Sequence, residues 1–327
     1  MSATETLART AASTPSRAAQ PVDRESRRLG FRLTLPTQLL VLFIAVFPLL
    51  MQLYISLTDW SPLDGVSWWK AWQSWNNFAN YTDLVEDRRW WGALGRTFII
   101  MLVCVPAEFL LALGLATLFM DDFPGKRIFY SILLMPMMVV PAVAGYMFFM
   151  LFQSGGPFNG IVSALTGMDI RIAWLSDPTL ALVAVMIADI WQWTPLMFLI
   201  LLAGLVGVPE DQLKAATLLG ANWRQRFFTI MLPRIKTIMV IALAIRVIEI
   251  FKIFDTLYIM TGGGPGVATE TISVYVYKVT TQDLIWGYVA AIALVILIVL
   301  SVLAVFAMKR MDAAKNGGAA VQKGARA

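Results

Sequence analysis

Ionisable side chains stand inside long apolar segments of this sequence, where a charge is costly unless it faces a cavity, a polar path or an opposite charge. The six are Glu108, Asp189, Arg246, Glu249, Lys252 and Asp255. The last four alternate in sign at intervals of three residues, so on one helix they could pair successively along a single stripe. Because such a stripe would be expensive against lipid, we expect it to face the interior of a protein assembly.

Polar and aromatic residues near these charges have the chemistry to bind a ligand that is rich in hydroxyl groups. Such a ligand needs fixed hydrogen-bond donors and acceptors together with flat apolar surfaces. The candidates are Asp189, Gln192, Arg246 and Glu249 for the first role and Trp191, Trp193 and Tyr258 for the second. The alternative is that the charges pair within the helical bundle or with a second subunit, and the sequence leaves both interpretations open. Glu108, two residues after Pro106, is expected to serve structure by bonding to a neighbour.

Catalytic chemistry is not expected from this composition. The chain has no histidine and one cysteine, Cys104, so it lacks the commonest metal ligand and can form no internal disulfide. The glycine-rich stretch Thr261-Gly262-Gly263-Gly264-Pro265 is not followed by Lys-Ser or Lys-Thr at the spacing of a phosphate-binding loop. We therefore predict no catalytic residue, no metal and no cofactor.

The elements that carry these residues are predicted to be membrane-spanning helices. Of the 327 residues, 58% are hydrophobic and 14% are charged, which is typical of an all-α polytopic membrane protein. A span needs about 20 predominantly apolar residues. Six segments qualify: Leu35 to Leu57, Thr97 to Met120, Tyr130 to Phe152, Leu180 to Val206, Ile238 to Tyr258 and Ile285 to Met308.

The distribution of Lys and Arg predicts the orientation. With six spans both termini lie on one side, and most basic residues fall on that side, which the positive-inside rule makes cytoplasmic. Because they flank spans, they indicate contact with membrane lipid, not nucleic acid. The predicted organisation is a disordered basic tail (1–34), a first span with an outer loop (35–92), a core (93–308) that includes a polar insert at 208–234, and a second basic tail (309–327).

The outer loop is unusually rich in tryptophan. Between Asp59 and Trp91 it contains seven tryptophans: Trp60, Trp68, Trp69, Trp72, Trp75, Trp90 and Trp91. Tryptophan is favoured at the boundary between water and lipid, so an aromatic belt is one interpretation. Contact with an extracytoplasmic partner is the other.

The polar insert carries the most specific pattern in the chain. It resembles the coupling loop of the permease subunit of ABC importers, with the motif EAA-x(2)-DGA-x(8)-I-x-LP. The matching residues are Lys214, Ala215, Ala216, Gly220, Ala221, Ile230, Leu232 and Pro233, with Lys214 in place of Glu and Leu219 in place of Asp. Three further stretches resemble the carbohydrate-importing branch, which includes maltose, glycerol-phosphate, trehalose and polyol permeases: Ile190 to Pro195, Phe254 to Tyr258 and Thr261 to Pro265.

The resemblance implies a type I ABC importer permease fold with a cytoplasmic coupling helix that docks on an ATPase. It also implies import of a sugar, sugar derivative or polyol across the cytoplasmic (inner) membrane. The expected partners are a second, homologous permease subunit, two cytoplasmic ATPase subunits and an extracytoplasmic solute-binding protein, so ATP hydrolysis would occur outside this chain.

Physical chemistry supports a docking role for the insert, here called the coupling insert (residues 208–234). The small residues Ala215, Ala216 and Gly220 permit close approach to a groove, and the candidate apolar contacts are Leu213, Leu218 and Leu219. Two alternatives remain. The insert could be an amphipathic connector on the inner leaflet, and the whole chain could be an ion-coupled secondary transporter, although such a transporter would not need the insert.

Overall fold

A computed structural model describes residues 24–324, and among them helices and loops account for the chain with no β-strand. The chain divides into two units, residues 1–52 and 53–327. Most of α2 (Arg24–Ser56) belongs to the first unit, which therefore consists of one long helix in its described part. Residues 1–23 of the tail predicted to be disordered (1–34) lie outside the described residues. From Arg24 onward the tail is helical, so the prediction of disorder is wrong for that part.

Within residues 24–324, four helices are long and apolar enough to cross a membrane, compared with six predicted spans. They are Phe31–Ser56 within α2, α4 (Arg88–Leu118), α8 (Pro178–Val206) and the continuous run Trp223–Phe251. The predicted sixth span corresponds to the apolar part, Trp286–Val302, of α14 (Trp286–Gly324), which continues as a helix beyond the predicted end at Met308.

The predicted third span is not one continuous helix. It consists of α5 (Lys126–Met138) and α6 (Pro141–Leu151), which meet at an angle of 98°. Proline has no amide hydrogen and disfavours helical geometry in the residue before it. Pro141 accordingly begins α6 after two extended residues, Val139 and Val140. The freed carbonyl of Val139 accepts a hydrogen bond from Gln192 at 3.0 Å.

The predicted fifth span, Ile238 to Tyr258, extends beyond the end of the helix that contains it. The run formed by α10 (Trp223–Arg226), a π-helical segment (Phe227–Met231) and α11 (Leu232–Phe251) stops at Phe251, and the chain leaves helical geometry before α12 (Asp255–Thr261). The predicted four-residue charge stripe is therefore interrupted. Arg246 and Glu249 lie on α11, whereas Lys252 and Asp255 stand on either side of the break.

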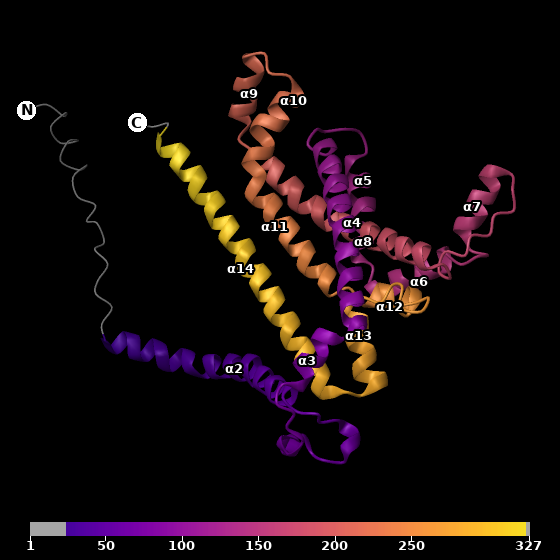
Figure 1. Ribbon diagram of the computed structural model, residues 1–327. Helices are drawn as coiled ribbons and strands as arrows, with labels where there is room; N and C mark the ends of the chain where they lie inside the picture. Colours follow the sequence, from indigo (N-terminus) through magenta and orange to yellow (C-terminus); the bar gives the residue numbers. More distant parts are fainter. Residues whose placement is uncertain (1–23, 325–327) are drawn as a thin grey trace, which may run out of the picture. The chain divides into compact units, whose positions relative to one another are not determined.

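The core of the second unit is built by close helix packing. The most extensive contact is between α4 and α8, and α11 packs on both (Figure 1). Alanines on these helices are fully buried, among them Ala112, Ala184 and Ala188. Small side chains let helix backbones approach closely in a membrane, where dispersion contacts hold helices together. On the other side of the core, α6 packs against α12 at Gly145.

The tryptophan-rich segment has a structure of its own. Two short 3₁₀ turns, Pro62–Asp64 and Trp68–Ser74, precede α3 (Ala79–Glu86). Asn80 is buried and donates from its side-chain amide to the carbonyls of Ser56 and Thr58, both at 2.9 Å. Trp68, Trp69 and Trp72 are exposed, whereas Trp90 is 5% exposed and belongs to the core. The seven tryptophans therefore do not form a single belt.

Candidate translocation site and coupling insert

The coupling insert begins with a short, well-capped helix. Pro209 precedes α9 (Glu210–Leu218), and the helix ends where Gly220 takes a left-handed conformation at φ +84°. The amide of Gly220 donates to Thr217 O at 3.0 Å and that of Ala221 to Ala216 O at 2.9 Å. This is the paired arrangement of a Schellman cap, which favours glycine because a Cβ is strained at positive φ.

A second arm stiffens the insert. Asn222 and Gln225 form a reciprocal capping box at the start of α10. The guanidinium of Arg226 donates to Thr217 Oγ1 at 2.6 Å and so joins the two arms. Trp223 stacks on Phe227 with ring centroids 5.1 Å apart. These contacts hold α9 as a defined projection.

The surface of α9 presents apolar side chains at its tip. Leu218 is 90% exposed and Leu219 is 89% exposed. Leu213, predicted to contact an ATPase with them, is half-buried and packs against the chain's own core instead. It therefore helps to anchor the helix, and its predicted contact with an ATPase stays a prediction.

The other motif residues surround the tip. A hollow of about 450 Å³ is lined by Ala216, Gly220, Ala221 and Ile230, among others. Ala215 and Pro233 are exposed, while Leu232 packs against the core. Lys214 donates to Glu210 Oε2 at 2.8 Å, one turn away on the same helix. That hydrogen bond, with the attraction between the charges, lowers the pKa of the exposed Glu210 carboxyl.

Inside the helical bundle, three charged residues from three helices form a buried group. Arg246 on α11 donates to Glu108 on α4, with Nη2 to Oε1 at 2.7 Å and a second bond from Nε to Oε2. The same Nη2 lies 2.7 Å from Asp189 Oδ2 on α8. All three side chains are less than 5% exposed. The predicted structural role of Glu108 is consistent with this geometry, and we name the group the buried triad.

A polar cavity of about 230 Å³ adjoins the buried triad. Asp189, Trp193, Arg246 and Glu249 line it, so four of the seven predicted ligand-binding residues meet here. The guanidinium of Arg246 lies 5.1 Å from the ring centroid of Trp193, within range of a cation–π contact. Glu249 pairs with the half-exposed Lys252 at 2.8 Å. The cavity thus combines an aromatic surface with charged donors and acceptors.

The other three predicted residues do not line the cavity. Trp191 packs edge-on against Phe148, with centroids 5.3 Å apart. Gln192 is buried and joins two elements: it donates to Val139 O and accepts from Thr256 Oγ1 at 3.2 Å. Tyr258 stacks on Phe254 at 5.1 Å. Their contacts indicate that they shape the walls around the cavity.

Phe254 and Thr256 are among the cavity residues that the prediction of ligand contacts missed. Both belong to the stretch Phe254 to Tyr258, whose resemblance to carbohydrate permeases was a usable signal. The missing information was the break after Phe251, which turns this stretch back toward α8.

The glycine-rich stretch forms a turn bonded mostly to itself. Thr261 Oγ1 shares a 2.7 Å hydrogen bond with Thr269 Oγ1, and Thr269 donates to Gly264 O at 2.9 Å. Gly262 and Gly263 have φ of +59° and +87°, and Gly264–Pro265 is a cis peptide. The stretch is therefore organised by its own backbone.

Glu270 fastens this turn to the rest of the unit. Its buried carboxylate accepts from Arg89 at 2.8 and 3.0 Å and from Lys278 at 3.0 Å. Burial alone would raise the pKa of Glu270, but the hydrogen bonds from Arg89 and Lys278 outweigh it and lower the pKa. The turn is thus fixed to α4 and to α13 (Ile272–Lys278).

A bundle of apolar helices with a charged internal cavity and a rigid projecting insert defines a multi-pass subunit of a membrane transport system. The chain belongs to the family of binding-protein-dependent transport system inner membrane components, whose family model matches residues 78–316. Members of this family are the permease subunits of ABC importers. They are transport components, and a separate subunit hydrolyses ATP.

Individual relatives agree with this assignment. The chain is 37% identical over 246 residues to a probable ABC transporter permease protein, y4oQ, of Sinorhizobium fredii. The matched region covers 75% of this chain and 77% of that protein. Over 258 residues the chain is 32% identical to the trehalose/maltose transport system permease protein MalF of Thermococcus litoralis, covering 77% and 83%.

The fold is also that of a solved importer. A crystal structure of a bacterial ABC transporter involved in the import of the acidic polysaccharide alginate contains a similar chain, with a TM-score of 0.75, 17% identity, and coverage of 88% of this chain and 96% of that one. The predicted all-α permease fold of the type I importers is confirmed. The family assignment supports the ABC importer over the ion-coupled alternative.

Proposed function

We propose that this chain forms part of the path by which a sugar, sugar derivative or polyol is imported across the inner membrane, driven by ATP hydrolysis in a partner subunit. The observation that carries the proposal is the cavity beside the buried triad, which offers an aromatic face on Trp193 and charged groups on Glu249 and Lys252 within the bundle. A polyhydroxyl ligand needs this combination. The name of the Thermococcus litoralis relative, a trehalose/maltose system, agrees with this class of substrate.

The cavity residues have different roles in this proposal. The guanidinium of Arg246 is engaged by Glu108 and Asp189, so it holds the triad together and presents its flat face to Trp193. Glu249, which is partly exposed, is free to exchange its bond with Lys252 for bonds to a ligand. We assign Glu249 and Trp193 as ligand contacts and Arg246 as the residue that positions them.

The coupling insert is proposed to dock on the ATPase. Two almost fully exposed leucines at the tip of α9, Leu218 and Leu219, are the apolar contacts, and they stand beside the hollow that includes Gly220. Such exposed apolar groups are typical of interaction sites. On the basis of the positive-inside rule, the insert and both termini are proposed to lie in the cytoplasm. The proposed complex contains a second, homologous permease, two ATPases and an extracytoplasmic solute-binding protein.

Cysteine labelling tests the path. In a Cys104→Ala background, single cysteines at Glu249, Thr256 and Ile248 would be treated with a small polar thiol reagent in membrane vesicles that contain the whole transporter. We expect labelling at 249 and 256 that trehalose or a related transported solute reduces, with little labelling at 248. Equal labelling at all three positions, unaffected by any solute that the transporter imports, would contradict the assignment.

A glycine substitution tests the coupling. Gly220→Arg places a long side chain at the tip of the insert, where a Cβ meets open space within the chain, so docking should suffer in addition to the backbone strain that any side chain causes at this positive φ. Gly167→Arg is the matched control, because Gly167 also ends a helix at positive φ with open space around it. We expect Gly220→Arg to lose ATP-dependent uptake and co-purification of the ATPase while Gly167→Arg keeps both. Normal uptake by Gly220→Arg would exclude this docking surface.

A further inference from the structure

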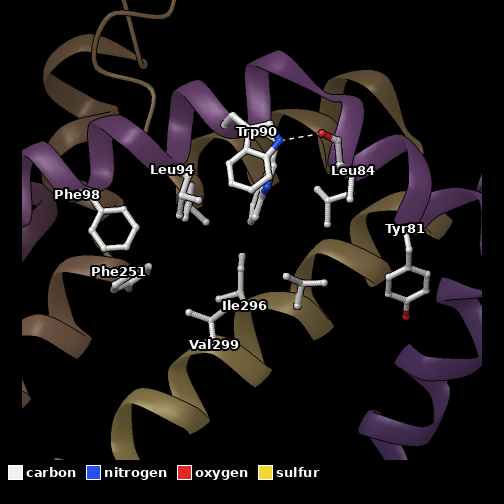
Figure 2. Close-up of a pocket in the computed structure, with 12 residues that line it drawn as sticks. Tyr81, Leu84, Trp90, Leu94, Phe98, Phe251, Ile296 and Val299 are labelled. Atoms are coloured by element: carbon white, nitrogen blue, oxygen red, sulfur yellow. Dashed lines mark hydrogen bonds between the residues drawn. The ribbon is translucent and has the colours of Figure 1, made fainter. Parts of the chain in front are cut away.

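A large apolar groove lies in the second unit and shares no lining residue with the charged cavity. Its volume is about 540 Å³, and its lining comes from α3, α4, α11, α13 and α14. Figure 2 shows Phe98 and Phe251 at one end of the groove, Tyr81 at the other, and Ile296 and Val299 facing Trp90 and Leu94 across it. The transport path described above uses none of these residues.

The groove presents hydrocarbon to its contents. Its floor includes Trp90 and Phe251, which are 5% and 3% exposed. At its rim, the indole N–H of Trp91 donates to Val85 O at 2.8 Å, and the hydroxyl of Tyr81 shares a 2.8 Å hydrogen bond with Ser56 Oγ. These two rim groups are therefore bonded to the protein itself. A polar ligand would therefore leave most of its hydrogen-bonding groups without partners in this groove, whereas an apolar ligand has no such groups to satisfy.

The groove is continuous with the surface that faces lipid. Its rim residues Phe98 and Val299 are 38% and 40% exposed. Their neighbours outside the groove, Leu102 on α4 and Ile298 on α14, are 69% and 61% exposed. Because α4 is long and apolar enough to cross a membrane, and the predicted sixth span includes the apolar part of α14, we expect acyl chains to surround these positions and to reach the groove from the side.

The dimensions of the groove correspond to one leaflet. On α4 it extends from Trp90, near the start of the helix, to Phe98, which at 1.5 Å per residue is about 12 Å. Half of a hydrocarbon core of about 30 Å is about 15 Å. At its outer end α3 packs against α14, and the corner between α3 and α4 is fastened because Asp87 accepts hydrogen bonds from Tyr275 and from Tyr288. A spanning helix could not continue through this closed end, whereas a lipid chain that enters from the side could stop there.

We propose that an acyl chain of a membrane lipid occupies this groove and fills the space between α4 and α14. The bound chain would provide the dispersion contacts that the facing side chains lack across the gap. It would support the α3 end of the bundle, where α13 and the glycine-rich turn are also attached. The site is independent of the transported solute.

Photolabelling tests the proposal with a matched pair of variants. The protein would be reconstituted in vesicles of phosphatidylethanolamine and phosphatidylglycerol that contain a trace of phospholipid with a diazirine on its acyl chain, and the labelled residues would be mapped by mass spectrometry. Val299→Trp fills the groove, whereas Ile298→Trp adds the same bulk next to it but outside the lining. If Val299→Trp does not fold, Val299→Phe replaces it.

We expect labels to concentrate on Val85, Trp91 and Leu94 relative to Leu102 in the wild type. Val299→Trp should reduce this labelling severalfold, and Ile298→Trp should leave it unchanged. Uniform labelling of the whole apolar surface, or equal labelling in both variants, would overturn the proposal. Crosslinking of a cysteine at 299 to another polypeptide in the assembled transporter would also overturn it, because a protein segment would then be the occupant.

Discussion

Arg246 should be among the most costly residues of this chain to replace. Arg246→Met removes the single cation of the buried triad and leaves the carboxylates of Glu108 and Asp189 facing each other, both almost inaccessible to water. Two opposite charges about 4 Å apart attract by about 4 kcal/mol at an effective dielectric constant of about 20. Part of that attraction offsets the cost of burying the charges, so the expected loss in the free energy of unfolding is about 3 to 5 kcal/mol.

The pattern among variants distinguishes this reasoning from a general effect of mutation. Arg246→Lys should lower the free energy of unfolding by an intermediate amount, because one ammonium group cannot reproduce the planar donors that reach both acids. The triple variant Glu108→Gln, Asp189→Asn, Arg246→Met should recover most of the loss, since no unpaired charge remains buried. Arg234→Met is the control on the same helix, where the side chain is exposed, and should change stability by less than about 0.5 kcal/mol.

The assay is unfolding of the purified protein in mild detergent by titration with a denaturing detergent. Each variant would first be checked for monodispersity. A loss for Arg246→Met no larger than that for Arg234→Met would refute the reasoning. So would a triple variant less stable than Arg246→Met, because the cost would then not come from unpaired charge.

Three further outcomes are expected. The pKa of Glu270 lies below its ordinary value of 4.5 because hydrogen bonds from Arg89 and Lys278 outweigh burial, so its contribution to stability should be complete above pH 4.5 and fall as pH decreases through the lowered pKa. Unfolding measured against pH should show this decline in the wild type, and Glu270→Gln should show less of it. Gly220→Ala should lower the free energy of unfolding by about 1 kcal/mol, because a Cβ is strained at φ +84°. Gly220→Asn should lower it by less, because asparagine adopts positive φ more readily. Gly145→Val should destabilise the protein by about 1 to 3 kcal/mol, because even a Cβ there would lie 3.0 Å from the backbone of α12; wild-type stability would contradict the close approach of α6.

The coupling insert shows how far local sequence could go. Its helix boundaries depend on groups within a few residues of one another, such as Gly220 at positive φ and the capping pair of Asn222 and Gln225. Residue types and their spacing are sufficient to predict local hydrogen bonds of this kind. What could not be predicted was that Leu213 turns inward, since that depends on a core contributed by α4, α8 and α11.

The candidate site shows the opposite case. An i, i+3 spacing allowed Arg246 and Glu249 to pair along one helix, and the sequence also left pairing across the bundle open; in the structure Arg246 pairs with Glu108 and Asp189, which are 138 and 57 residues away in the sequence. Spacing identifies possible neighbours along one helix, and Glu249 does pair with Lys252 at this spacing, but it cannot reveal the acids on α4 and α8 that packing brings to Arg246. The bend between α5 and α6 was also missed, because the chain is apolar on both sides of it and hydropathy alone does not reveal a bend.

The sequence by itself determined the class of this protein, because apolar segments of sufficient length must form helices in a membrane and the coupling motif is contiguous. It also determined the caps and turns, which rest on local hydrogen bonds and on glycine's freedom at positive φ. Only the tertiary structure decided which charge neutralises which, which aromatic residues face the cavity, and that an apolar groove remains open between α4 and α14. Those outcomes depend on the distances between helices far apart in the chain, and such distances are set by packing, which no periodicity encodes.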